Sequence, residues 1–123
     1  MKRLAVAAFA LALAAPPAPA SRPAKGTAVG IAEREFRISL YRRTVRPGLV
    51  RLNVRNLGED THDLVVRSRR GRILATSGDI RSGRTATLSV RLRRAGTYRL
   101  LCTKANHTAR GMKARLRVSR RRA

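Results

Sequence analysis

The feature that most constrains this chain is an apolar–polar alternation with a period of two, repeated in several short runs. Apolar residues at 50, 52 and 54 alternate with polar residues at 51, 53 and 55, and the same pattern recurs over 86–93, 97–102 and 112–118. A period of two places alternate side chains on opposite faces of a strand, one face buried and the other in water. The alternation therefore predicts half-buried strands.

Turn signals separate these runs, at Pro47-Gly48, Gly58, Arg70-Gly71, Ser82-Gly83 and Ala95-Gly96. Short strands separated this closely by turns are typical of an all-β sandwich or barrel. We expect about seven to eight strands within 27–119 and no long helix. A short turn or helical piece is expected over Thr76–Ile80.

The N-terminal pattern predicts a secretory signal peptide over residues 1–20. Lys2 and Arg3 precede an apolar run over 4–15, and Ala18 and Ala20 form a small-x-small cleavage signal. The apolar run is too short for a membrane span, which needs about 20 residues. We expect an exported protein, periplasmic or extracellular, with a flexible lead at 21–26, one domain at 27–119 and a basic tail at 120–123.

The net charge is strongly positive, +23, from 29 Lys and Arg against 6 Asp and Glu. Nucleic acid is a natural partner for such a charge, but export argues against it. The cations alternate along the strands, as in Arg91-Leu92-Arg93, which favours a solvated sheet face. The field would still attract anionic partners or an anionic membrane surface. We expect a monomer whose partner protein presents an anionic surface to Lys104 and Arg110.

Four soft or imidazole side chains follow the signal peptide: His62, Cys102, His107 and Met112. The last three are spaced C-x4-H-x4-M, with Cys102 ending one predicted strand and Met112 beginning the next. The loop between them therefore starts and ends at the same end of the core. Two imidazoles and a thiolate with a weak axial thioether select copper and make it redox-active. The pattern predicts one type 1 copper ion alternating between Cu(II) and Cu(I).

A catalytic site or a zinc site would use only some of these four side chains. A Cys–His catalytic pair needs a nucleophile, a base and an orienting group, and it leaves His62 and Met112 unexplained. Structural zinc sites do not use Met. A multicopper oxidase or a nitrite reductase needs further His ligands, and this chain has only two His.

The motif and its surroundings resemble the cupredoxins, the family of small blue copper proteins. The resemblance runs from about Glu35-Phe36 to Val118 and rests on Pro47-Gly48, Asn56, Gly58, His62-Asp63, Gly96-Thr97-Tyr98, Cys102, His107 and Gly111-Met112. It implies a Greek-key β-sandwich with copper at one end. His62, Cys102 and His107 would be equatorial ligands and Met112 the axial one.

The sequence departs from the family pattern at three places, two of them beside the ligands. The third is the surface around His107, which is usually apolar in the family and here carries Lys104 and Arg110. Ala105-Asn106 stands where relatives often carry Pro-Gly, and Asn106 can replace the Gly because Asn tolerates a left-handed backbone. Asp63 stands where many relatives carry the Asn that ties the two ligand loops together.

Three functions are compatible with a chain that resembles the cupredoxins. The first is a one-electron carrier outside the cytoplasmic membrane, which is not an enzyme. The second is a copper carrier that donates its metal to an oxidase. The third is a metal-free binding module of the same fold that uses its basic surface.

Overall fold

The computed structural model describes residue 15 and residues 25–121. The predicted signal peptide, apart from Ala15, and residues 21–24 and 122–123 lie outside the described residues. The described residues form nine strands, in the order β1 (Thr27–Arg34), β2 (Arg37–Leu40), β3 (Thr44–Val45), β4 (Gly48–Asn56), β5 (His62–Arg67), β6 (Ile73–Ile80), β7 (Thr85–Leu92), β8 (Gly96–Leu101) and β9 (Lys113–Val118). Within the described residues, no helix is long and apolar enough to cross a membrane.

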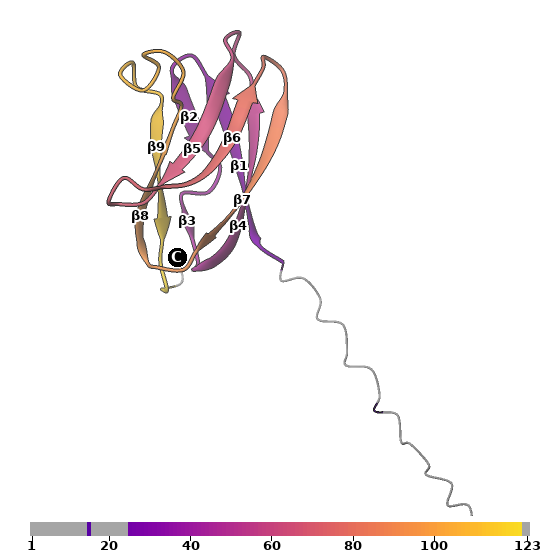
Figure 1. The fold of residues 1–123 in the computed structure, drawn as a ribbon, viewed down its shortest axis with the longest axis vertical. Coiled ribbons are helices and arrows are strands. Elements are labelled where there is room, and N and C mark those ends of the chain that lie inside the picture. The colour runs from indigo at the N-terminus through magenta and orange to yellow at the C-terminus, as the bar shows by residue number, and fades with distance from the viewer. Residues whose placement is uncertain (1–14, 16–24, 122–123) are drawn as a thin grey trace, which may run out of the picture.

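The strands form two packed sheets (Figure 1). One sheet has the order β2-β1-β4-β7, and the other has the order β3-β9-β8-β5-β6. The pairs β1–β4 and β3–β9 are parallel, and the other pairs are antiparallel. The prediction of an all-β sandwich is confirmed, and the described residues form nine strands where seven to eight were expected; the shortest are β2 and β3.

The alternating residues fill the space between the sheets, as the sequence predicted. In β4, the side chains of Val50, Leu52 and Val54 are fully buried while the polar residues between them are exposed. In β9, Leu116 and Val118 face the same core. Burial of this apolar surface is the main stabilising contribution to such a fold.

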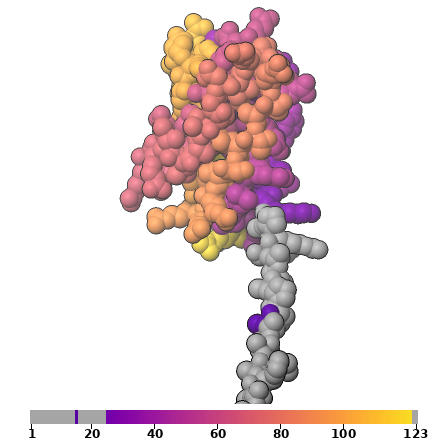
Figure 2. Space-filling model, turned by 45° about the vertical axis from the view of Figure 1, so that its right-hand side comes forward, coloured from indigo at the N-terminus to yellow at the C-terminus, as the bar shows by residue number. Residues whose placement is uncertain are grey.

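The expected turn or helical piece over Thr76–Ile80 is wrong, because these residues belong to β6. The pairing of β6 with β5 is irregular, with a register shift between Asp63 and Val65. Gly78 has a φ of +68°, a left-handed conformation that glycine adopts easily. The bulge and the glycine explain why this strand lacks a regular alternation in its sequence. The turn between β5 and β6 protrudes from the side of the molecule (Figures 1 and 2).

One end of the sandwich collects several connections that are distant in sequence. The β1–β2 turn, the β4–β5 loop and the β8–β9 loop meet there, at the top of Figure 1. Asn56 secures the β4–β5 loop, because its Nδ2 donates to the carbonyls of Asp60 at 2.7 Å and Ile80 at 2.8 Å. Its Oδ1 accepts from the Gly58 N–H at 2.9 Å. These bonds determine where the chain enters β5, at His62.

Candidate metal centre

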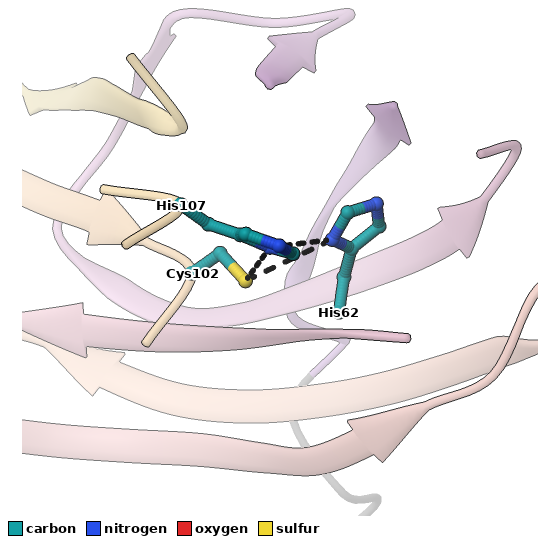
Figure 3. A group of neighbouring side chains, drawn as sticks. All are labelled: His62, Cys102 and His107. Atoms are coloured by element: carbon teal, nitrogen blue, oxygen red, sulfur yellow. Dashed lines mark hydrogen bonds between the residues drawn. The ribbon is translucent and has the colours of Figure 1, made fainter. Parts of the chain in front are cut away.

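Three of the four predicted donors lie together at this end of the sandwich (Figure 3). His62 is the first residue of β5, Cys102 follows β8 directly, and His107 lies in the loop between β8 and β9. His62 and Cys102 are fully buried and His107 is 8% exposed. Figure 3 shows the Nδ1 atoms of both imidazoles and the Sγ atom of Cys102 facing one another.

The three donor atoms form a triangle of the size that a metal ion requires. His62 Nδ1 lies 3.3 Å from His107 Nδ1, and Cys102 Sγ lies 3.9 Å and 3.5 Å from these two atoms. The point equidistant from all three is about 2.1 Å from each, close to the roughly 2.0–2.3 Å of metal–imidazole and metal–thiolate bonds. A His2Cys set of this size fits copper.

Burial raises the pKa of the Cys102 thiol, because a thiolate in an apolar environment is poorly solvated. A bound cation at the centre of the triangle would reverse this preference and hold the sulfur as thiolate. Cys102 is therefore expected to lose its proton only when a metal ion is bound.

The loop that carries these donors is closed by its own hydrogen bonds. The Cys102 N–H donates to the Met112 carbonyl at 3.1 Å, and the Met112 N–H donates to the His107 carbonyl at 3.0 Å. The Thr108 hydroxyl donates to the Cys102 carbonyl. Met112 itself is fully buried, directly before β9. These bonds place Met112 beside the other donors along the backbone, and its role as the axial ligand stays a prediction.

The two departures that lie beside the ligands have different outcomes. Asp63 does join the ligand segments, because its carboxylate accepts from both the N–H and the hydroxyl of Thr103, the residue after Cys102. The expectation for Asn106 is wrong: among the residues that the structure describes, the non-glycine residue with positive φ is Ala105, at +36°. The loop turns one residue earlier than expected, where the His107 N–H donates to the Lys104 carbonyl at 2.9 Å.

Carboxylates face the outer nitrogens of both imidazoles. His62 Nε2 lies 3.0 Å from Glu35 Oε1, and His107 Nε2 lies 3.7 Å from Asp60 Oδ2. The backbone N–H of Asp60 also donates to Glu35 Oε1, which lowers the pKa of Glu35, and the bond to His62 acts in the same direction. A carboxylate on the outer nitrogen sets the tautomer and orientation of a metal-binding imidazole. The inward Nδ1 of His62 is thereby left as the donor toward the metal.

Glu35 carries no sequence signal that marks it as part of the site. Glu35 lies in the β1–β2 turn, far from the ligand motif in sequence, and only the packing of the two sheets brings it to His62. Glu33, two residues earlier, is fully buried, and neither carboxyl oxygen has a hydrogen-bond partner among the described residues. Burial, with the nearby charge of Asp63, raises the pKa of Glu33 to about 8. Glu33 is therefore mostly protonated at neutral pH.

The chain matches no family model and no curated protein by sequence. Its structure is similar to reduced auracyanin from Roseiflexus castenholzii, at 22% identity and a TM-score of 0.67, over 78% of this chain and 99% of that one. Auracyanin A, a "blue" copper protein from Chloroflexus aurantiacus, matches at 18% identity and a TM-score of 0.67, over 77% and 100% of the two chains.

An enzyme shares the same fold. A copper-containing nitrite reductase from Thermus scotoductus matches at 16% identity and a TM-score of 0.58, over 76% of this chain but only 31% of its own. With the two-sheet topology and the His-Cys-His group, these similarities show that the chain has the cupredoxin fold.

Proposed function

We propose that this chain is a mononuclear type 1 copper protein that carries single electrons. His62, Cys102 and His107 would bind the ion, with Met112 as the fourth ligand. The observation that carries the proposal is the buried triangle of two Nδ1 atoms and one Sγ atom at one end of a cupredoxin fold. When bound, the copper supplies a one-electron Cu(II)/Cu(I) couple.

The protein residues prepare the site for this couple. Glu35 holds the ring of His62, Asp63 connects β5 to the residue after Cys102, and burial excludes water from the donors. A site held rigid by such bonds changes little between oxidation states, which keeps the reorganisation on electron transfer small. His107 is the most exposed of the three donors, so its ring is the proposed exit for the electron.

We propose a carrier and not an enzyme. Both His residues of the whole sequence belong to this one group, and none remains for a second copper centre. The alternative of a copper donor for an oxidase uses the same ligands. Reversible voltammetry without metal loss supports the electron carrier, whereas rapid copper transfer to a chelator supports the donor. If the protein binds no copper, both copper functions are excluded, and the metal-free binding module is the alternative that remains.

Glu35→Gln is expected to raise the reduction potential of the copper-loaded protein. Gln keeps an acceptor oxygen near His62 Nε2 but removes the negative charge that stabilises the oxidised ion. Complete loss of such an outer partner typically weakens metal binding by about 10–100-fold, so Gln, which keeps the acceptor, should weaken copper binding by less than this. Voltammetry and competition with a chelator measure both effects. Glu59→Gln is the matched control, because Glu59 is an exposed acid in the β4–β5 loop. Equal shifts in the two variants would remove the proposed role of Glu35.

We also propose that the protein works as an exported monomer and that its redox partner presents an anionic surface to the His107 end. The support is the net charge of +23 and the N-terminal signal pattern. Two cations of the β8–β9 loop differ in their surroundings: Lys104 pairs with Asp79, whereas Arg110 lies over the Phe36 ring at 4.8 Å from its centroid. Arg110 therefore contributes more uncompensated charge near His107.

Arg110→Gln is accordingly expected to slow electron transfer to a small anionic reagent severalfold at low salt, and Lys104→Gln to slow it less. The effect should vanish as salt screens charges over a Debye length of about 8 Å at physiological ionic strength. Stopped-flow rates with anionic and cationic reagents at several salt concentrations measure it. Rates that are indifferent to reagent charge would exclude electrostatic steering at this end.

A further inference from the structure

Three arginines lie directly opposite one another across the outer face of one sheet. Arg99 of β8 is paired in register with Arg67 of β5 on one side and Arg115 of β9 on the other. Side chains at directly paired positions share a face, and like charges at such positions destabilise a sheet. This arginine row (Arg67, Arg99 and Arg115) therefore carries a local cost that a bound anion would offset.

No acidic side chain compensates the arginine row. Among residues 25–121, the ion pairs involve Lys104, His62 and His107, and none involves an arginine. All six acidic residues of the chain lie in or next to the strand ends and turns around the metal donors: Glu33, Glu35, Glu59, Asp60, Asp63 and Asp79. In addition, the Nε atom of Arg67 is buried without an acceptor in the described structure.

An open hollow lies over β8, β9 and the loop between them, and two members of the arginine row, Arg99 and Arg115, line it. Its volume is about 560 Å³, and it is lined by Arg99, Leu101, Thr108, Lys113, Ala114 and Arg115. Three cations surround a small apolar floor with one hydroxyl. A neighbouring hollow of about 260 Å³ shares Lys113 and Arg115 and adds a fourth cation, Arg43.

We propose that this hollow binds a multivalent oxyanion of the phosphate type. A guanidinium offers five N–H donors and an ammonium offers three. The two guanidinium groups and one ammonium of the hollow therefore offer more donors than the two oxygens of a single carboxylate can accept. A phosphate carries up to two charges and three strong acceptor oxygens, and Arg recognises it in bidentate geometry. The chemistry of the hollow therefore favours phosphate over a carboxylate or chloride.

The hollow adjoins the metal centre through the backbone. Its lining residues Leu101, Thr108 and Lys113 are the immediate neighbours of Cys102, His107 and Met112. A bound anion would therefore place negative charge near the ion and stabilise its more positive, oxidised form. This linkage, which rests on the proposed function, predicts a lower reduction potential with phosphate bound. By reciprocity, the oxidised protein binds phosphate more tightly by the same factor.

The binding itself is tested on the full-length mature protein without copper. Inorganic phosphate is titrated at constant ionic strength by calorimetry, with chloride as the comparison anion. Arg99→Gln with Arg115→Gln should weaken phosphate binding by about tenfold or more, the usual effect of losing charge-assisted hydrogen bonds. The matched control is Arg51→Gln with Arg91→Gln, which removes the same charge from exposed positions of the other sheet. Equal weakening in both double variants, or no preference for phosphate over chloride, would overturn the site.

Replacing Arg99 and Arg115 relieves the repulsion within the arginine row. The double variant should therefore be at least as stable as the native protein, which a thermal melt measures. Co-sedimentation with vesicles of anionic phospholipid distinguishes the source of the phosphate. If the native protein sediments with the vesicles and the double variant does not, the ligand is a lipid headgroup. If the native protein binds inorganic phosphate but does not sediment with the vesicles, the ligand is a free anion.

The linkage is tested on the copper-loaded protein, by its reduction potential with phosphate and with chloride. A phosphate-induced drop that Arg99→Gln with Arg115→Gln removes supports the linkage. An unchanged potential in a protein that still binds phosphate overturns the linkage alone. A protein that binds phosphate but no copper overturns the proposed function and leaves the anion site standing.

Discussion

Cys102→Ser is expected to abolish the intense visible absorption of the copper-loaded protein. The strong colour of a type 1 site arises from charge transfer between a thiolate sulfur and Cu(II), and a serine hydroxyl cannot supply it. The variant keeps both imidazoles, whose Nδ1 atoms lie 3.3 Å apart in the native protein. It should therefore still bind copper through nitrogen and oxygen donors. Its spectrum should be the faint one of an ordinary site, measured by titration with Cu(II).

Met112→Leu is the control for this experiment. Leucine fills a similar volume but offers no sulfur, so the thiolate band should persist while the reduction potential rises, because a weak donor to the oxidised ion is lost. A native protein that shows only a faint colour with Cu(II) would contradict the type 1 assignment. A Met112→Leu variant with an unchanged potential would contradict the axial role of Met112.

Copper is expected to raise the melting temperature of the protein strongly. The ion would join β5 through His62 to the β8–β9 loop through Cys102 and His107, and these donors come together only in the folded chain. At free copper about 100 times Kd, binding to the native state alone adds about 2.7 kcal/mol to the free energy of unfolding. For a domain of about 100 residues this corresponds to a rise of about 10–20 °C. Differential scanning calorimetry of apo and loaded protein measures it.

His107→Ala provides the control for this stabilisation. It removes one of the three donors, so most of the gain from copper should disappear. Because the ring is buried and packs on Phe36, the gain is measured against the melting temperature of the apo variant itself. Equal melting temperatures for apo and loaded native protein would show that the ion does not join these segments.

The strands could be predicted from sequence because their signal is local. In β4 and β9 the alternation that fills the core is visible residue by residue, and Cys102 and Met112 could be assigned to one end of the core because each borders a strand. In β6 a bulge and Gly78 interrupt the alternation, and the local prediction there was wrong. Ala105, and not Asn106, has the left-handed backbone because the closure of the whole loop decides which residue must turn.

The sequence by itself determined the sandwich and the chemical identity of the candidate donors. Side-chain period and ligand type are properties of single segments, so they need no knowledge of what lies across the core. Only the tertiary structure decided that Glu35 contacts His62, that Glu33 is buried and that Arg67, Arg99 and Arg115 form one row. These contacts depend on strand register and on how two sheets pack. A shift of one residue in register would move every side chain of a strand to the other face.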